Sequence, residues 1–319
     1  MIIGVIGATS NIANKAYLPV YAKMQADHRF ILYSRQWEKA EEVRKHYKFE
    51  YATEDLSALE TVDLVIIHAA TSQHFELAKR YLSAGVPVLM DKPVSEKLAE
   101  VKELQKIADQ NNTLFVVAFN RRFAPQTAKL KALPDKNMVK VSKNLANSAS
   151  EKITFLMYDI FIHPLDTLIY LLDDEILEVN YSLKKNQDGQ LTRAIVMLET
   201  ATTSGIATMN LEAGAFTEEF TVESPRESLR LSELCELEKF TGIDRQKFGI
   251  SGWQSATYNS GFDEIISAMV LAVEKFDGQN RQELLTELKQ ENILKSHEII
   301  DQMLKWKVTD RNISISVNC

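Results

Sequence analysis

The chain has 319 residues, enough for two domains, and its composition is that of a globular protein: 45% hydrophobic and 25% charged residues, with 11 Gly and 7 Pro. These values exclude a collagen-like, low-complexity or intrinsically disordered chain. The 37 basic residues are outnumbered by 44 acidic ones and form no basic run, which gives a formal charge of −7. We therefore expect neither nucleic acid nor an anionic membrane as a partner.

The sequence also carries expectations about location and metals. There is no run of about 18 apolar residues, so no membrane-spanning helix is expected. The residues from Met1 to Gly7 read directly as a strand, without the basic region or cleavage site of a signal peptide, which predicts a cytoplasmic protein. Cys235 and Cys319 suit a reducing compartment and make no metal-ligand spacing with the six histidines, so no metal site is predicted.

The first 120 residues alternate between two hydrophobic periodicities. Short apolar runs predict buried parallel strands at Ile2–Ile6, Arg29–Tyr33, Asp63–His68, Pro87–Met90 and Leu114–Phe119. Stretches with the helical period of about 3.6 residues lie between them, at Gln36–Tyr47, Gln73–Ala84 and Ser95–Gln110. Because strand and helix alternate, residues 1–120 are expected to form a doubly wound α/β domain with right-handed crossovers.

The pattern changes after Phe119, and the polar stretch Asn120–Pro125 predicts a boundary before a second domain at residues 121–319. An apolar helix is expected at Tyr158–Leu172. Strand patterns without intervening helices follow at Glu178–Leu183, Arg193–Leu198, Gly205–Asn210, Thr217–Glu223 and Ser228–Ser232. Short turns between strands predict a large, mostly antiparallel sheet. Helices at about Phe262–Lys275 and Arg281–Lys305 and a short tail, Ile313–Val317, complete an α+β domain.

The turn after the first predicted strand has features of a dinucleotide-binding loop. Such loops place a pyrophosphate on backbone N–H groups at a helix N-terminus and use glycines for the tight turn and close approach. Of those glycines only the first is present here, in Gly7-Ala8-Thr9-Ser10-Asn11-Ile12-Ala13. Ser10 can donate its hydroxyl to a phosphate, and Ala13 is small enough for close packing. The alternative is a strand–turn–helix that binds no ligand.

The end of the second predicted strand bears on the choice of cofactor. An acid at this position binds the ribose 2′-hydroxyl of NAD, whereas an arginine accommodates the 2′-phosphate of NADP. The strand ends in Tyr33-Ser34-Arg35, and Lys39 follows one helical turn later. A hydroxyl and a guanidinium suit a phosphate, so Ser34 and Arg35 favour NADP over NAD. The alternative is that Arg35 and Lys39 are solvated charges at the start of a helix.

Three polar clusters could carry chemistry. Asp91-Lys92-Pro93 follows a buried strand, at the sheet edge where open α/β sheets bind ligands. Asn120-Arg121-Arg122-Phe123 follows the last strand of the same sheet. Asp159 and His163 are four residues apart, so they share a face if one helix spans both. Each pattern alone is also typical of a turn or a local ion pair, and only their combination indicates a site.

These clusters and several short motifs resemble the glucose–fructose oxidoreductase, inositol dehydrogenase and rhizopine-catabolism (Gfo/Idh/MocA) family, and most of all its MviM-like branch. The resemblance covers nearly the whole chain. It rests on Ala16-Tyr17-Leu18-Pro19, Thr71 to His74, Asp91-Lys92-Pro93, Phe119 to Pro125, Asp159 to Asp166, Gly252-Trp253-Gln254 and Gly261-Phe262.

The resemblance implies an N-terminal Rossmann domain and an NAD(P)-dependent dehydrogenase or reductase that acts on a CH–OH group of a sugar, polyol or related compound. Lys92 matches the lysine of the E-K-P motif, which reaches the reacting carbon–oxygen group and the nicotinamide ribose. Asp159 and His163 match the D-x-x-x-H pair that binds substrate and moves the proton. The matches also imply that Thr71, His74 and Asp91 bind the cofactor. Asp91 stands where the E-K-P motif has its glutamate. The glycine loop is one residue longer than the family's G-x-G-x-x-G/A pattern.

The chemistry suits these residue types. Imidazole titrates near neutrality, so His163 is expected to take or give the proton. Lys92 would stabilise negative charge on the carbonyl oxygen, and Asp159 would orient His163 or bind a neighbouring hydroxyl. The central expectation is that Lys92 and His163, from different halves of the chain, meet beside a bound nicotinamide. The family further implies a homodimer or higher homo-oligomer formed through the second-domain sheet.

A rival hypothesis is a non-catalytic regulatory protein on the same fold that senses a dinucleotide or a sugar. The loss of glycines from the loop supports it, because weak cofactor binding would leave an enzyme idle.

Overall fold

The computed structural model describes residues 1–305 and 315–316, and these form two compact units. The first unit consists of residues 1–120 and 261–291, and the second of residues 121–260 and the described residues from 292 onward. The sequence placed all of 121–319 in the second domain, whereas 261–291 joins the first unit. Helical periodicity shows that such a segment has an apolar face, but it does not show which domain that face covers.

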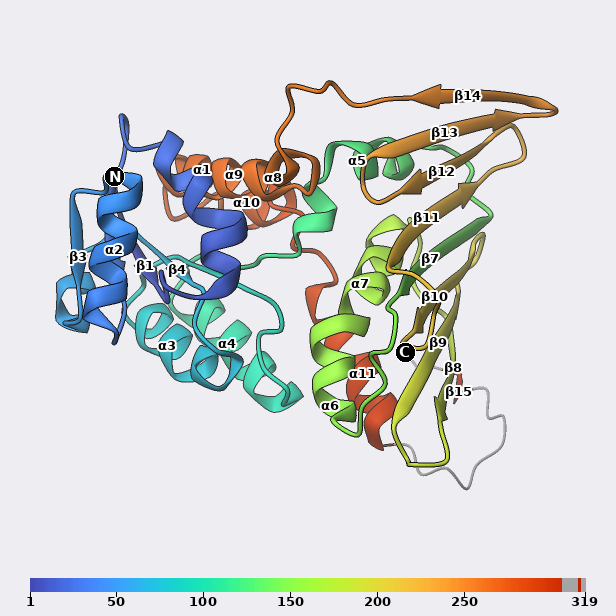
Figure 1. The fold of residues 1–319 in the computed structure, drawn as a ribbon, viewed down its shortest axis with the longest axis horizontal. Coiled ribbons are helices and arrows are strands. Elements are labelled where there is room, and N and C mark those ends of the chain that lie inside the picture. The colour runs from blue at the N-terminus through green and yellow to red at the C-terminus, as the bar shows by residue number, and fades with distance from the viewer. Residues whose placement is uncertain (306–314, 317–319) are drawn as a thin grey trace. The chain divides into compact units, whose positions relative to one another are not determined.

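The first unit contains a six-stranded parallel sheet with the strand order β3-β2-β1-β4-β5-β6 (Figure 1). Its strands are β1 (Ile2–Ile6), β2 (Arg29–Tyr33), β3 (Tyr51–Thr53), β4 (Leu64–Ile67), β5 (Val88–Met90) and β6 (Phe115–Val117). The strand order reverses direction at β1, between β2 and β4, which is where ligands bind in open α/β sheets. The sequence predicted all of these strands except β3, because its three residues are too few to show a hydrophobic periodicity.

Helices cover the parallel sheet, and β4 is buried along its whole length as a strand between two helical layers must be. The helical segments are η1 (Ala13–Tyr17), α1 (Leu18–Lys23), α2 (Trp37–Tyr47), η2 (Leu56–Leu59), α3 (Thr71–Ser83), α4 (Leu98–Gln110), α9 (Phe262–Lys275) and α10 (Arg281–Glu287). Figure 1 shows α3 and α4 side by side. Helix α9 packs on η1 and α1, with the ring of Phe262 edge-on to Tyr17 at 5.0 Å between centroids.

The last long helix predicted from the sequence is two helices in the structure, α10 and α11 (Ile293–Lys305). Lys289 and Asn292, between them, have φ values of +54° and +59°. A right-handed helix cannot continue through left-handed residues, so the chain ends one helix and begins another. The break also separates the units, because α10 belongs to the first and α11 to the second.

The second unit contains a nine-stranded sheet with the order β14-β13-β12-β11-β7-β10-β9-β8-β15. Its strands are β7 (Met138–Asn144), β8 (Glu178–Lys185), β9 (Leu191–Glu199), β10 (Ser204–Asn210), β11 (Thr217–Glu223), β12 (Ser228–Ser232), β13 (Glu236–Thr241), β14 (Asp244–Phe248) and β15 (Ile315–Ser316). Only the pairing of β7 with β10 is parallel, so the predicted α/β plus α+β fold class is confirmed.

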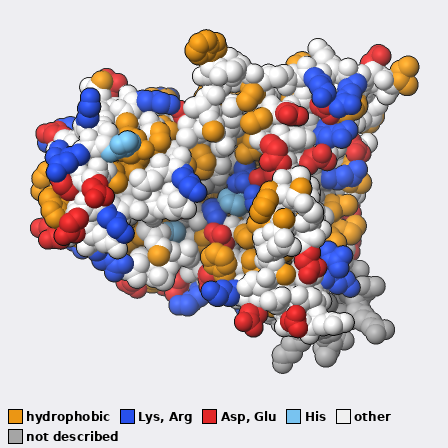
Figure 2. All heavy atoms as spheres, in the orientation of Figure 1, with side chains coloured by type: hydrophobic (Ala, Val, Ile, Leu, Met, Phe, Trp, Pro, Cys, Tyr) orange, Lys and Arg blue, Asp and Glu red, His pale blue; other side chains and the backbone are white. Residues whose placement is uncertain are grey.

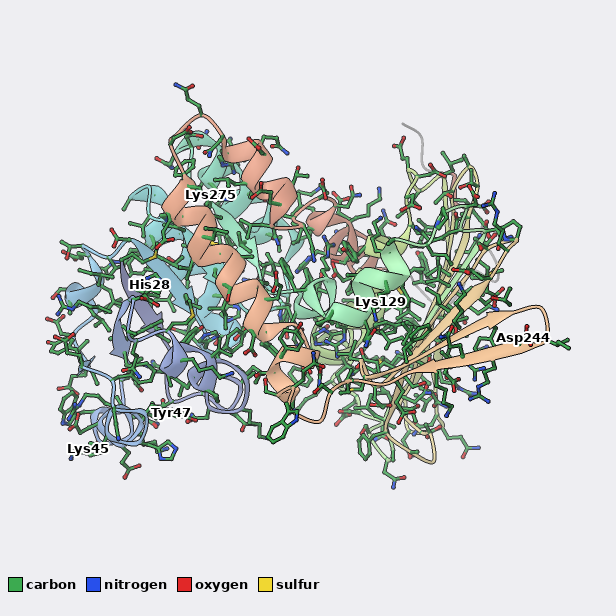
Figure 3. All side chains as sticks on the ribbon, turned by 90° about the horizontal axis from the view of Figure 1, so that it is seen from above. His28, Lys45, Tyr47, Lys129, Asp244 and Lys275 are labelled. Carbon is green, nitrogen blue, oxygen red and sulfur yellow. The ribbon has the colours of Figure 1, made fainter. Side chains whose placement is uncertain are left out.

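Three strands of this sheet were not predicted. β7 was missed, and β13 and β14 each carry three charged residues that hide a strand pattern. The β13–β14 hairpin has Asp244 at its tip (Figure 3). Of the predicted tail Ile313–Val317, only Ile315–Ser316 is described, as β15, and Cys319 lies outside the described residues.

One face of the nine-stranded sheet carries helix α7 (Ile162–Leu171), which packs on β7 and β10 (Figure 1). Gly205 in β10 permits this close packing, since a Cβ there would lie 2.8 Å from a methyl carbon of Leu168. Helix α6 (Ile153–Leu156) and the π-helical turn η4 (Met157–Phe161) lead without a break into α7. The remaining helical segments of this unit are η3 (Asn120–Phe123), α5 (Pro125–Lys131), α8 (Ala256–Asn259) and α11.

A buried ion pair connects η3 to α7. Both guanidinium contacts of Arg122 with the carboxylate of Asp166 are short, at 2.7 and 2.9 Å, and the side chains are 1% and 2% exposed. The guanidinium also lies over the ring of Tyr170, 5.5 Å from its centroid. Burial raises the pKa of Asp166, and the charge of Arg122 opposes that rise. Neither charge could remain inside the protein without the other.

Charged side chains of both signs are interspersed on the surface shown in Figure 2, rather than gathered into a basic patch. Within the described part of the chain, none of the helices combines the length and the apolarity needed to cross a lipid bilayer.

We predict that Asp166→Asn lowers the free energy of unfolding by about 3–5 kcal/mol, because it leaves the charge of Arg122 buried without an ionic partner. Urea denaturation followed by circular dichroism would measure the change. The matched control is Glu50→Gln, which breaks the exposed pair of Arg29 and Glu50, with side chains 64% and 66% exposed, and should cost less than about 1 kcal/mol. Equal effects of the two substitutions would contradict the structural role of the buried pair.

Candidate active site

Gly7 closes the end of β1 in a conformation that only glycine adopts easily. Its φ is +82°, and a Cβ at this position would lie 2.7 Å from both the backbone nitrogen of Ala69 and the carbonyl carbon of His68. The Gly7 N–H donates to the carbonyl oxygen of Tyr33 at 3.1 Å. The ends of β1, β2 and β4 therefore converge on one residue that has no side chain.

Ser10 starts the helix that follows the loop. Its N–H donates to the carbonyl of Gly7 at 2.9 Å, and its Oγ accepts from the N–H of Ala13 at 3.2 Å. The helix opens with the π turn η1, which holds one residue more per hydrogen-bonded ring than an α turn. Asn11 and Ile12 of the loop are exposed.

A cavity of about 220 Å³ lies at the point where the strand order reverses. Its lining includes five predicted cofactor-binding residues, Gly7, Thr9, Ser10, Ser34 and Arg35. The other predicted residues are not among those that line it: Asn11, Ile12, Thr71, His74, Asp91 and Lys92. Lining residues that the sequence did not identify include Gln36, His68, Ala69, Ala70 and Gln73.

Polar groups at the end of β2 are fixed by hydrogen bonds. Oγ of Ser34 lies 3.0 Å from Oγ1 of Thr9 and accepts from the N–H of Gln36 at 3.2 Å. Ser34 is buried, and Arg35 beside it is exposed. A cavity with a bare glycine turn on one side and hydroxyls and a guanidinium on the other fits the phosphate and ribose groups of a dinucleotide.

Asp91 is the centre of a buried hydrogen-bond network. One carboxylate oxygen accepts from the hydroxyl of Tyr17 at 2.5 Å, and the other lies 2.7 Å from Nδ1 of His68. Nε2 of His68 lies 2.7 Å from the hydroxyl of Tyr21. Burial alone would raise the pKa of Asp91, but the attraction and hydrogen bond of His68 lower it. Burial and the charge of Asp91 raise the pKa of both tyrosines.

The network gives Asp91 interior partners, so its carboxylate connects β5 to the first helix and to the cavity-lining His68. Tyr17 lay within a motif identified in the sequence, but its partners are 51 and 74 positions further along the chain, beyond the reach of periodicity arguments.

Lys92 follows Asp91 directly and is partly exposed, and its peptide bond to Pro93 is cis. His74 is buried on α3, where Nδ1 lies 2.8 Å from the carbonyl oxygen of Pro93 and Nε2 lies 2.9 Å from that of Ala69. Burial lowers the pKa of His74. His74 thus fixes the Asp91–Pro93 turn to the start of α3, whose first residue is Thr71.

In the second unit, Asp159 lies in η4 and His163 in the first turn of α7, so one continuous helical segment carries both. Nη1 of Arg121 lies 2.7 Å from Nδ1 of His163. The same guanidinium forms a bidentate ion pair with Glu218, and Lys143 lies 2.9 Å from that carboxylate. Burial alone would raise the pKa of Glu218, but Arg121 and Lys143 lower it to about 2.

The sequence indicated the polar segment of Arg121 but no partner for it, and it gave no sign of Glu218 or Lys143. These side chains come from β11 and β7, and Glu218 is 97 positions away from Arg121. A charged residue in a strand looks like an ordinary surface position when no pairing register is known.

The predicted catalytic residues are divided between the units: Lys92 belongs to the first, and Asp159 and His163 to the second. Trp253, from the Gly252-Trp253-Gln254 motif, is 98% exposed. Within residues 1–305 and 315–316, no three or more His, Cys, Asp or Glu side chains are arranged to hold a metal ion.

Residues 1–119 match the family described as "Oxidoreductase family, NAD-binding Rossmann fold". The putative oxidoreductase YceM of Salmonella typhimurium is 28% identical over 194 residues, which are 60% of this chain and 63% of that protein. The matched region is thus less than two thirds of that relative's length.

Two solved structures share the fold over almost the whole chain. A Gfo/Idh/MocA family oxidoreductase from Vibrio cholerae is 25% identical with a TM-score of 0.80, covering 96% of this chain and 100% of that one. A dehydrogenase (MviM) from Clostridium difficile is 23% identical with a TM-score of 0.83, covering 95% and 98%. The resemblance inferred from the motifs is confirmed: residues 1–119 match this oxidoreductase family, and nearly the whole chain shares the fold of a Gfo/Idh/MocA family structure.

We predict that Gly7→Ala lowers the free energy of unfolding by more than about 3 kcal/mol, because it combines a left-handed φ with a clash against backbone. Gly189→Ala is the matched control: its φ is +78°, but a Cβ there meets nothing within 4 Å, so only the conformational cost of about 1–2 kcal/mol remains. Denaturant titration of both variants measures the difference. Equal losses would show that the close approach at Gly7 has no energetic weight.

Proposed function

We propose that the protein is an NAD(P)-dependent oxidoreductase that interconverts a secondary alcohol and a carbonyl group in a sugar, polyol or related compound. The observation that carries this proposal is the cavity at the switch point of the parallel sheet, bounded by the side-chain-free turn at Gly7. The match of residues 1–119 to an oxidoreductase family with an NAD-binding Rossmann fold supports it.

The residues of the cavity fit the parts of a dinucleotide. Gly7, Thr9 and Ser10 would hold the pyrophosphate, and Ser34 with Arg35 would hold the adenosine ribose and its substituent. When bound, the nicotinamide accepts or supplies the hydride. Asn11, Ile12, Thr71, His74 and Asp91 remain proposed contributors to cofactor binding, the last two through the positions that they fix.

The side chains that we propose to contact the substrate are Lys92, Asp159 and His163. Lys92 and His163 can each donate a hydrogen bond to the reacting oxygen, and Lys92 can neutralise negative charge that develops on it. Asp159 can accept from a neighbouring hydroxyl, which suits a substrate with several hydroxyl groups.

We also propose a preference for NADP. Ser34 is held by Thr9 and by the N–H of Gln36, and Arg35 follows it at the rim of the cavity. A hydroxyl and a guanidinium can both donate to a 2′-phosphate, and this edge of the cavity offers no acidic side chain to a 2′-hydroxyl.

A homo-oligomer formed through the nine-stranded sheet remains part of the proposal. Ile195 and Met197 of β9 are 37% and 42% exposed, on a face that carries no helix among the described residues. Two exposed apolar side chains on neighbouring positions of one sheet face are suited to contact with a second copy.

The alternative function is a regulatory protein that binds a dinucleotide or a sugar without turnover. One observation favours it: the loop keeps a single glycine, and the Oγ of Ser10 already caps the N–H of Ala13, which leaves fewer donors for a phosphate.

We predict that Lys92→Met and His163→Ala each reduce kcat on the order of 10²-fold or more while dinucleotide binding persists. The assay is the absorbance change of the nicotinamide with a panel of sugars and inositols. Lys106→Met and His46→Ala, two exposed positions on the first unit, are the matched controls and should leave kcat unchanged. Wild-type protein that binds dinucleotide but turns over no member of the panel would favour the regulatory alternative.

For the cofactor, we predict a larger thermal shift with NADPH than with NADH, because a bound ligand stabilises the native state in proportion to its affinity. Arg35→Ala should weaken NADPH binding roughly 10-fold to 100-fold, the value of a charge-assisted hydrogen bond, with little change for NADH. Arg29→Ala, at the opposite end of β2, is the control. A shift that is equal for the two cofactors, or unchanged by Arg35→Ala, would contradict the assigned preference.

A further inference from the structure

The hydrogen bond between Arg121 and His163 has a direction that chemistry fixes. Nη1 of Arg121 lies 2.7 Å from Nδ1 of His163. A guanidinium has only N–H donors and keeps its proton in proteins, so it cannot accept a hydrogen bond. Nδ1 must therefore be the acceptor, with its lone pair directed at Arg121.

Arg121 is held in this orientation by a second contact. Its Nε and Nη2 donate to the two carboxylate oxygens of Glu218, with 2.8 Å between Nη2 and Oε2. The two side chains are only 11% and 10% exposed, so solvent screens the pair weakly. Lys143 adds a further positive charge 2.9 Å from the same carboxylate, which keeps Glu218 ionised. The carboxylate thus orients the guanidinium, and the guanidinium orients the imidazole.

We propose that Arg121 is a positioning residue that fixes His163 in the tautomer with its proton on Nε2, so that His163 donates a hydrogen bond to the reacting oxygen instead of removing a proton from it. The inference rests on the proposed function, because it assigns the part that His163 plays in that reaction. A neutral imidazole has one N–H, and with Nδ1 accepting from Arg121 that hydrogen is on Nε2. A second proton on Nδ1 would face an N–H of a cation, which opposes formation of the imidazolium.

This tautomer changes the proton balance that the sequence predicted. When the alcohol is oxidised, the C–H bond breaks with its electron pair going to the nicotinamide, the O–H bond breaks, and the carbonyl forms. His163 cannot take the hydroxyl proton, because the lone pair on Nδ1 is engaged and Nε2 already carries hydrogen. The hydroxyl proton therefore leaves to water and not to His163. In reduction water returns the proton, and in both directions His163 stabilises the oxygen through the hydrogen bond from Nε2.

Nitrogen-15 NMR of the full chain tests the tautomer without any substrate. Long-range proton–nitrogen correlation spectra distinguish a protonated ring nitrogen from one that bears a lone pair, and His163→Asn assigns the signals by their loss. We expect an Nε2–H ring for His163, with the lone pair on Nδ1 directed at Arg121. An Nδ1–H ring, or an imidazolium near neutral pH, would overturn the inference.

Three variants separate positioning from a structural role. Arg121→Gln can both donate and accept, so it should give mixed tautomers, protonation of His163 at higher pH and a loss of kcat on the order of 10²-fold, with KM changed less. Arg121→Lys, which also only donates, should retain the Nε2–H ring and recover part of kcat, and it covers the case in which Arg121→Gln fails to fold. Lys140→Gln, an exposed position on β7, is the control and should change nothing. An unaltered tautomer in folded Arg121→Gln would overturn the assignment.

The two proposals fail in different ways. If the spectra show the Nε2–H ring but no substrate of the panel is turned over, the proposed oxidoreductase function is contradicted and the tautomer assignment stands. If turnover is found and the wild-type ring carries its proton on Nδ1, the function stands and the role of Arg121 is overturned.

Discussion

The backbone approach at Gly7 is the constraint on which the first unit's site depends. Because no side chain separates the end of β1 from His68 and Ala69, the carboxyl ends of β1, β2 and β4 converge on one small volume. That convergence leaves a cavity with exposed backbone on one side, and it brings the buried partners of Asp91 within hydrogen-bonding distance of one another. A residue with a Cβ at this position would push β4 away and change both features.

The two units use charge in comparable ways. In each, a buried carboxylate orients a second group that can face a ligand. Asp91 orients His68 beside the cavity, and Glu218 orients Arg121 against His163. Both arrangements rest on side chains held by several hydrogen bonds, which reduces the conformational entropy that a ligand would otherwise have to remove on binding. Both helices next to these groups contain a π turn, η1 and η4, a feature that is rare in general and frequent at functional sites.

The sequence predicted local order well and long-range pairing poorly. Buried strands such as β1 and β4 follow from continuous apolar runs, and the positions of Gly7 and Ser34 at strand ends follow from those runs. β3 is too short and β13 too charged to show a period, so neither was found. The partners of Arg121 and Asp91 depend on strand register and on which helix covers which sheet, and a single sequence contains neither. The same reason explains why α9 and α10 were placed with the wrong neighbours: an amphipathic helix has an apolar face whatever it packs against.

The first unit is discontinuous in the chain, and this affects the order in which the protein is made. During synthesis β1 to β6 leave the ribosome long before residues 261–291. That later segment supplies the ring of Phe262 against Tyr17 and the side chain of Gln290, which accepts from the N–H of Val117 at 2.9 Å. The strands of the other unit are translated in the interval. The six-stranded parallel sheet therefore stays partly uncovered until residue 291 has been synthesised. Completion of the first unit is a late event, and a chaperone or a slowly translated segment in this region would influence it.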